Sequence, residues 1–310
     1  MPTSASQFFM EGTCEDRAYL NTRDESLGID AKRFVEDLWS RFQFQHLADP
    51  HFREDARNHF LQRCWEMYLA VTLLEHGFDL RRHGDEGPEF YADIQGHRVW
   101  FEAVAPGPGL GADCVPQLVP GQFAEVPIER ILLRFTNALE EKRHRYAAAT
   151  TKGIVAPKDC YVLAINSRGI RHAPYAHSMP HFVQAFLAVG PLAVDFDVKT
   201  GEIIDSRYLY RPSVSKANAA SVSTSAFLGQ EAAFCSAVLH SGVDCANHPE
   251  QLGGDFSVLH NPSALLPLDQ LMFSWCEEFR IANDTLLRTK PNSSLQRPDG
   301  SRGSPSAAER

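Results

Sequence analysis

The sequence lacks several features that would place it outside the ordinary globular proteins. Its 310 residues contain no apolar run approaching the roughly 20 residues that a membrane-spanning helix requires. Residues 1–12 have no basic segment followed by an apolar core, so a secretory leader is not expected. The seven cysteines are odd in number and form no CxxC pair, which is typical of free thiols in a reducing compartment. These absences predict a cytoplasmic protein that does not enter membranes.

Positive charge is also in deficit, because the net charge is −9. This balance argues against a protein that coats nucleic acid through bulk electrostatics, but it leaves room for an enzyme with a local basic groove. One segment has that bias, with six basic residues against three acidic ones between Glu129 and Lys152. A solvated helix face would show the same pattern.

Hydrophobic patterning divides the chain into three parts and predicts an α/β fold. Residues 1–30 are polar and without pattern, and we expect a loosely ordered arm. Residues 31–285 have no linker and form a single domain, with a core at about 51–170 and an extension at 171–285. Residues 286–310 are dominated by Ser, Pro, Arg and Gly and predict a disordered tail.

The core is expected to run helix, three strands, helix, strand, in a mixed sheet. A first helix at Ala31–Leu47 is followed by a second that begins after Asp49-Pro50 and ends at Gly77. The remaining core elements are strands at Phe78–Arg82, Glu89–Ile94, Arg98–Ala105 and Cys160–Asn166 and a helix at Ile128–Ala148.

The extension is rich in predicted strands that continue the central sheet. A hairpin is expected around Lys199-Thr200-Gly201, with strands at Val194–Val198 and Glu202–Ile204. Further elements are helices at His181–Val189 and Asp269–Arg280 and strands at Phe234–His240 and Phe256–His260.

Three carboxylates stand out because of their surroundings. Glu66 is the only charge between Cys64 and Leu74 in an apolar helix, and Glu102 interrupts an apolar strand. A buried carboxylate must be paired, protonated or bound to a metal, because desolvating it alone is costly. Glu89 follows Gly87-Pro88 at the start of the preceding strand.

Strand alternation predicts that these acids converge. If the two strands pair through a turn at Gln95-Gly96, Glu89 or Asp93 can lie near Glu102, since Glu89 and Asp93 share a strand face. Paired carboxylates favour a hard divalent cation such as Mg²⁺, with Mn²⁺ as a substitute. Glu66 could instead form a salt bridge with Arg63, and Asp93 could simply face solvent.

The order of elements and the string Gly87-Pro88-Glu89-Phe90, followed after twelve residues by Glu102-Ala103-Val104, resemble the PD-(D/E)XK (restriction-endonuclease-like) nuclease superfamily, with a degenerate motif. The resemblance covers roughly residues 55–170. It implies that Glu89 and Glu102 are metal ligands and that Glu66, the helical acid of the site, is a third ligand. Val104 stands where the superfamily has its lysine.

The next helix offers a replacement for that lysine. Lys142 and Tyr146 are four residues apart on one helical face and resemble the QxxxY helix of RecB-like members, with lysine at the Gln position. A plain surface lysine and a packing tyrosine are the alternative interpretations.

The resemblance implies a metal-dependent endonuclease that hydrolyses phosphodiester bonds in nucleic acid, DNA rather than RNA, using Mg²⁺ or Mn²⁺. Glu66, Glu89, Glu102 and Lys142 would be its catalytic residues, supported by Asp93 and Tyr146. The alternative is a catalytically degenerate module that binds nucleic acid or a protein partner, which the missing lysine and the net negative charge favour. A homodimer is left open.

Overall fold

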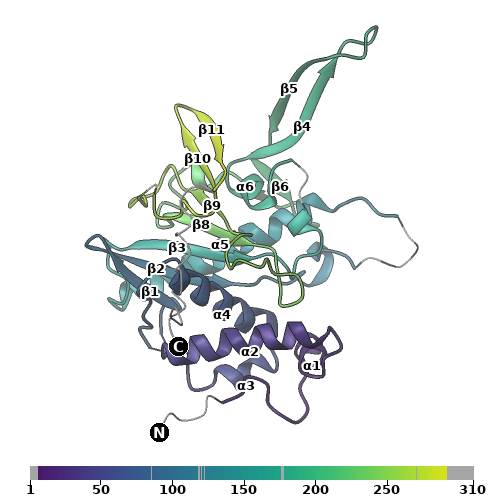
Figure 1. The fold of residues 1–310 in the computed structure, drawn as a ribbon. Coiled ribbons are helices and arrows are strands. Elements are labelled where there is room, and N and C mark those ends of the chain that lie inside the picture. The colour runs from purple at the N-terminus through teal and green to yellow at the C-terminus, as the bar shows by residue number, and fades with distance from the viewer. Residues whose placement is uncertain are drawn as a thin grey trace, which may run out of the picture.

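A computed structural model describes residues 6–84, 86–117, 119, 121, 123–175, 178–269 and 271–291. It shows a mixed α/β fold whose centre is a seven-stranded sheet of strand order β1-β2-β3-β8-β9-β10-β11 (Figure 1). The strands are β1 Phe90–Ile94, β2 His97–Val104, β3 Cys160–Asn166, β8 Ala237–Ser241, β9 Ser257–His260, β10 Glu277–Ala282 and β11 Thr285–Thr289. The expected α/β class is therefore confirmed.

Parallel pairing in this sheet is confined to β2–β3, β3–β8 and β9–β10, and the remaining neighbours are antiparallel. The predicted turn at Gln95-Gly96 joins β1 to β2, with Phe90 opposite Phe101 and Asp93 opposite Arg98. Because β8 to β11 add to the edge beyond β3, the extension continues the central sheet, as expected.

Helices cover the sheet on both faces. Alternate residues of β3 show the division, since Val162 packs in the core beneath the N-terminal helices and Leu163 packs in a second core with the later helices. The helices are α1 Arg17–Arg23, α2 Ile29–Phe44, α3 Phe52–Ala56 and α4 Phe60–Glu75 on the first face, and α5 Ile128–Thr151 and α6 His181–Phe186 on the second. Short 3-10 turns lie at η1 Gly111–Asp113, η2 Ala173–Tyr175 and η3 Ala226–Leu228.

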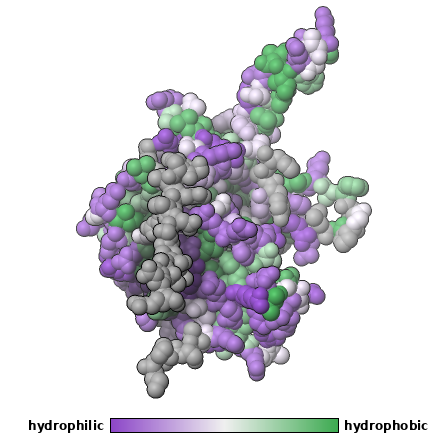
Figure 2. All heavy atoms as spheres, viewed as in Figure 1, coloured by the Kyte–Doolittle hydropathy of each residue, from purple (hydrophilic) through white to green (hydrophobic). Residues whose placement is uncertain are grey.

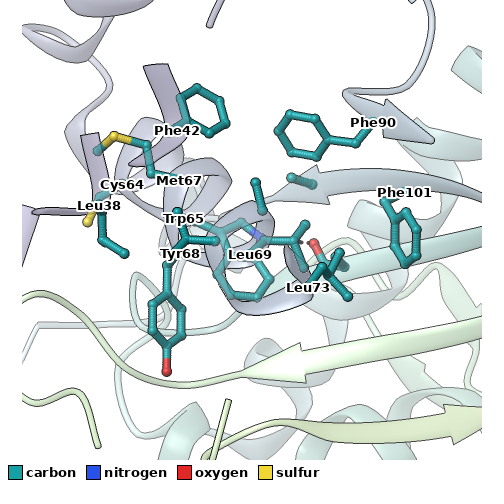
Figure 3. Close-up of a cluster of buried hydrophobic side chains, with 14 of the residues drawn as sticks. Leu38, Phe42, Cys64, Trp65, Met67, Tyr68, Leu69, Leu73, Phe90 and Phe101 are labelled. Carbon is teal, nitrogen blue, oxygen red and sulfur yellow. Dashed lines mark hydrogen bonds between the residues drawn. The ribbon is translucent and has the colours of Figure 1, made fainter. Parts of the chain in front are cut away.

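Figure 3 shows the first core, where side chains of α2 and α4 meet those of β1 and β2. Phe42 lies edge-on to Phe90 with ring centroids 5.8 Å apart. Trp65 donates from its indole nitrogen to the carbonyl oxygen of Ala164 at 3.1 Å, which ties α4 to the centre of the sheet. This core fixes α4, and with it Glu66, relative to the strands.

The N-terminal segment differs from the loose arm that its composition predicts. Phe8 and Tyr19 are fully buried, and the backbone N–H of Phe8 donates to Glu36 at 2.8 Å. Asp16 caps two helices at once, because one carboxylate oxygen accepts from Ala18 at the start of α1 and the other from Phe60 at the start of α4. Residues 6–30 are therefore part of the domain.

The prediction of one continuous helix from Asp49-Pro50 to Gly77 was wrong, because the Asp16 cap marks the start of a separate helix at Phe60. The chain forms α3, leaves the helix at residues 57–59 and starts again as α4. The expected strand Phe78–Arg82 is reduced to one bridge, in which Arg81 and Tyr91 exchange two backbone hydrogen bonds of 2.8 Å. The core therefore has two regular strands before α5 rather than three.

Two predictions near the C-terminus were also wrong. The segment Asp269–Arg280 does not form a helix among its described residues, because β10 begins at Glu277 and pairs with β9. The predicted tail begins too early, since β11 includes residues 286–289 and Arg288 pairs with Glu277 at 2.8 Å. Residues 292–310, the rest of the predicted tail, lie outside the described part of the chain.

The expected hairpin is present and longer than predicted. Strands β4 Val189–Phe196 and β5 Ile203–Tyr210 pair only with each other and project from the body (Figure 1). Apolar residues remain visible along this arm in Figure 2. Phe196 and Ile203 are among the exposed apolar residues of these two strands. A smaller two-stranded sheet, β6 Ser213–Ser215 with β7 Ser221–Ser223, follows it. Among the described residues no helix has the length and apolarity to cross a membrane.

Candidate active site

Glu102 lies inside the sheet because of strand alternation. Phe101 and Ala103 on either side of it pack toward the N-terminal helices. Val104 points the other way, into the core that α5 completes, and Glu102 has the same parity as Val104. The Glu102 side chain is only 1% exposed, so its charge requires a partner inside the protein.

Lys142 is that partner. Its side chain is only 4% exposed, and its ammonium Nζ contacts Oε1 of Glu102. The helix presents Lys142 to the sheet because Phe135 and Leu139 precede it on one face at helical spacing and are buried. Arg145, one turn later, places Nη1 at 3.6 Å from the same Glu102 oxygen. The alternative of a surface lysine is excluded by this burial.

Glu89 reaches the same region from the loop before β1. Its Oε2 accepts a hydrogen bond of 2.7 Å from the backbone N–H of Ala103, a residue beyond the last β1–β2 pair at Phe90 and Phe101. The carboxylate therefore takes the place of a strand partner at this edge. Burial raises the pKa of Glu89 well above its ordinary value, and the negative charges of Glu102 and Glu66 raise it further, while Lys142 opposes them.

The loop that carries Glu89 depends on Gly87. Its φ of +100° lies in the region that residues with a side chain rarely adopt, and an added Cβ would stand 2.9 Å from Cγ2 of Ile154. Pro88 follows with its own restricted backbone. The pair Gly87-Pro88 thus directs the chain so that Glu89 turns toward β2.

Glu66 joins the site from α4 and is held by two neighbours. Gln62 donates to its Oε1 at 2.8 Å, and Arg63 donates to its Oε2 at 2.8 Å. Burial raises the pKa of Glu66, and the Arg63 guanidinium counteracts that rise. The salt bridge to Arg63 that the sequence allowed is therefore present, and Arg63 also binds Asp49 and Asp55 at 3.1 and 2.6 Å.

Gln62 links this acid to the strand. Its side-chain amide donates to the carbonyl oxygen of Ala103 at 3.2 Å and accepts from the backbone N–H of Ala105 at 2.7 Å. Gln62 and Glu89 together occupy the backbone groups of Ala103 that β1 does not reach. The three carboxylates are consequently held at one end of β2.

Of the two supporting residues, one lies away from this cluster and the other packs beside it. Asp93 pairs with Arg98 at 2.9 Å on the exposed end of the β1–β2 hairpin, four residues along the strand from Glu89 or about 13 Å. The structure therefore does not bring Asp93 to the site. Tyr146 packs its ring against Tyr161 and Phe234, with centroids 5.1 and 4.9 Å away.

Tyr161 is a residue that sequence reasoning missed. It lies on β3 opposite Trp100 and is fully buried on the face that meets α5. Burial raises the pKa of Tyr161 well above its ordinary value, and the carboxylates of Glu102 and Glu89 raise it further. The available signal was a hydroxyl in the strand Cys160–Asn166, which is otherwise apolar until its last residue, with the parity of the residues that face α5.

Two cavities flank the loop Gly87-Pro88. One, of about 240 Å³, is lined by Glu102 and Tyr161. The other, of about 340 Å³, is lined by Glu66 and Glu89. Arg145 lines both cavities, so the cluster of acids can be approached from two sides past one guanidinium.

The donor set suits a cation bound by two carboxylates. The contacts above use Oε2 of Glu89 and Oε1 of Glu102 and leave the second oxygen of each for another ligand, whereas both oxygens of Glu66 have partners. Among the described residues no group of three or more His, Cys, Asp or Glu side chains is arranged to hold a metal. Two carboxylates are nevertheless sufficient for Mg²⁺, which keeps several water ligands.

Comparison with known proteins adds no relative to this description. No protein-family model, no curated protein and no solved structure matches the chain. The chemistry of the site is therefore argued from its residues and their geometry.

Proposed function

We propose that the protein is a metal-dependent nuclease that hydrolyses phosphodiester bonds, with DNA as the favoured substrate. The observation that carries this proposal is the contact between Lys142 and Glu102 beside Glu89. Two mutually repelling carboxylates at a strand end, with a buried ammonium group from the neighbouring helix, form a charge pattern suited to phosphoryl transfer. Burying these charged groups is costly in free energy, so their placement inside the protein argues for a function.

The proposed core is restriction-endonuclease-like and comprises α4, β1, β2, α5 and β3. Its first strand is reduced to the bridge between Arg81 and Tyr91. Val104 occupies the position of the superfamily lysine, and Lys142 supplies the positive charge from α5. The side chains of Val104 and Glu102 share a strand face, so a cation from α5 reaches the region that a lysine at 104 would reach.

Each residue has a distinct role in this proposal. Glu89 and Glu102 would hold Mg²⁺ or Mn²⁺, which lowers the pKa of the attacking water and neutralises charge on the phosphate. Lys142 stabilises the charge that develops in the transition state, and Arg145 at the rim contacts the substrate phosphate. Glu66, whose oxygens are already bonded, keeps the strand end and Arg63 in place rather than serving as a ligand.

The alternative function is a non-catalytic module that binds nucleic acid or a protein partner. The ion pair of Lys142 with Glu102 is also compatible with this alternative, because its two charges balance without a metal. The raised pKa of Glu89 argues against the non-catalytic module. The ion pair of Lys142 with Glu102 does not compensate the charged form of this second carboxylate, which stays destabilised. A nuclease predicts that a divalent cation binds there, and a non-metal module does not.

The first test is therefore thermal unfolding with and without divalent cation. At a concentration of Mg²⁺ or Mn²⁺ about 100 times its Kd, we expect about 2.7 kcal/mol of stabilisation. Glu89→Gln should abolish this response, and Asp93→Asn, which alters a carboxylate outside the site, should retain it. A parallel assay incubates single- and double-stranded DNA and RNA with the protein in Mn²⁺ or in EDTA. Absence of both the thermal shift and cation-dependent cleavage would overturn the proposal.

The raised pKa of Glu89 also predicts how stability depends on pH. Between the ordinary value of 4.5 and the raised value, the folded protein holds a proton that the unfolded chain releases. The free energy of unfolding should therefore fall as pH rises through that window. Glu89→Gln should flatten this slope in urea titrations without metal. Asp93→Asn should not, because Arg98 lowers the pKa of Asp93 from 3.8 and places its effect below the window.

A further inference from the structure

The smaller of the two cavities has walls of three chemical kinds. Its volume is about 240 Å³, and it lies between the loop before β1 and the last turns of α5. Pro88, Ala149 and Ile154 give it an apolar side. Arg145 and Lys152 stand at its exposed rim, where Lys152 pairs with Glu86 at 3.0 Å. Glu102 connects it to the proposed reaction centre.

Tyr161 lines this cavity. Its buried hydroxyl has no well-formed hydrogen bond to a described residue, but the Glu102 carboxylate is close enough to act on it as a hydrogen-bond acceptor and to raise its pKa. A buried hydroxyl without a well-formed hydrogen bond destabilises the fold, whereas phenylalanine would fill the same space without that penalty. The Tyr161 ring packs against the rings of Tyr146 and Phe234, whose centroids are 5.1 and 5.7 Å away. A phenol carries its proton at neutral pH and can therefore donate a hydrogen bond to a ligand.

These walls match one class of ligand. Apolar side chains suit the faces of a flat ring, the buried phenol offers one donor to a polar edge, and the exposed guanidinium of Arg145 suits a phosphate. Ligand pockets commonly measure about 300–1,000 Å³, so this cavity of about 240 Å³ suits one part of a ligand, such as a single base whose phosphate stays at the rim. A base inserted here cannot remain paired with a complementary strand.

We propose that this cavity binds one unpaired nucleotide of the substrate strand, with the base against Pro88 and Ile154, the Tyr161 hydroxyl donating to it and Arg145 on its phosphate. The inference rests on the proposed nuclease function and specifies its substrate as single-stranded or locally unpaired nucleic acid. Tyr161 is then a residue that determines specificity.

The test measures binding separately from cleavage. Isothermal titration with deoxyadenosine and thymidine 5′-monophosphates, in EDTA and with the full chain, should detect binding at the cavity. Tyr161→Phe should weaken it by about 10-fold, the scale of one hydrogen bond, and should raise the Tm or leave it unchanged. A purely structural tyrosine would instead lower the Tm when its hydroxyl is removed.

A matched pair of variants tests the location. Ala148 lines the cavity and is exposed, and Ala147, its neighbour on α5, is exposed but does not line it. Ala148→Trp should block nucleotide binding and reduce cleavage of single strands, and Ala147→Trp should do neither. Inorganic phosphate should bind more weakly and respond little to Ala148→Trp.

The outcomes separate the two proposals. Nucleotide binding without cleavage supports the cavity and contradicts the nuclease. Cleavage of blunt duplexes as fast as single strands, together with no effect of Ala148→Trp, overturns the cavity assignment and leaves the nuclease standing. Absence of nucleotide binding in the wild-type protein also overturns it, whatever the cleavage assay shows.

Discussion

Glu102→Ala should eliminate metal-dependent cleavage and also destabilise the fold by about 3–5 kcal/mol. The loss of activity follows from removing a proposed metal ligand. The loss of stability follows because Lys142, with 4% of its side chain exposed, would be left as a buried charge without its partner. The sequence alone suggests an intact fold for this variant, since it does not show that Glu102 is paired. Urea unfolding and a cleavage assay on the purified variant measure the two effects.

Two further variants separate ligation from folding. Glu102→Gln combined with Lys142→Met removes both charges, and should recover much of the lost stability while remaining inactive. Glu102→Gln alone should be inactive and intermediate in stability, because the amide can still accept a hydrogen bond from Lys142. Cleavage at the wild-type rate by Glu102→Ala would refute the role of Glu102.

Lys142→Ala should reduce the cleavage rate by at least ~100-fold, the scale of losing one well-placed electrostatic donor. Metal binding should persist, because Glu89 and Glu102 remain and their mutual repulsion increases without the ammonium group. Single-turnover cleavage and the thermal shift with Mn²⁺ report the two quantities. Arg143→Ala is the control, because Arg143 is exposed on the same helix and pairs only with Glu140 among the described residues.

A second-site change tests whether position 104 is equivalent to position 142. Val104 lies two residues after Glu102 on the same face of β2 and packs in the core that contains Leu139. Val104→Lys in the Lys142→Ala background returns a cation to this face and fills part of the space that Lys142 vacates. It should recover part of the activity. Full activity in Lys142→Ala alone would end the idea that this lysine replaces the one at position 104.

Patterns of two-residue alternation were the most informative part of the sequence. The apolar strands Cys160–Asn166 and Arg98–Ala105 were found within about a residue of β3 and β2 because both are buried on two faces. The lone acids Glu66 and Glu102 were singled out for the same reason, and both proved to be buried. Burial of an isolated carboxylate is visible in sequence, because its neighbours reveal the environment.

Contacts between distant segments were beyond sequence patterns. Phe8 and Tyr19 lie in a polar segment, yet they are buried by α2 and α4, which are far along the chain. The strand that includes Phe279 was expected to be a helix, because its apolar spacing fits both periods and only pairing with β9 decides between them.

By itself, the sequence determined the α/β class, the hairpin at Gln95-Gly96 and the group of candidate acids, because each depends on spacing within one element. Tertiary structure alone decided that Lys142 reaches Glu102, that Asp93 faces away, and that the buried Tyr161 stands beside the acids. These facts depend on how α5 and β3 are placed against β2. That placement follows from the summed packing of side chains on several elements, none of which specifies it from its own residues.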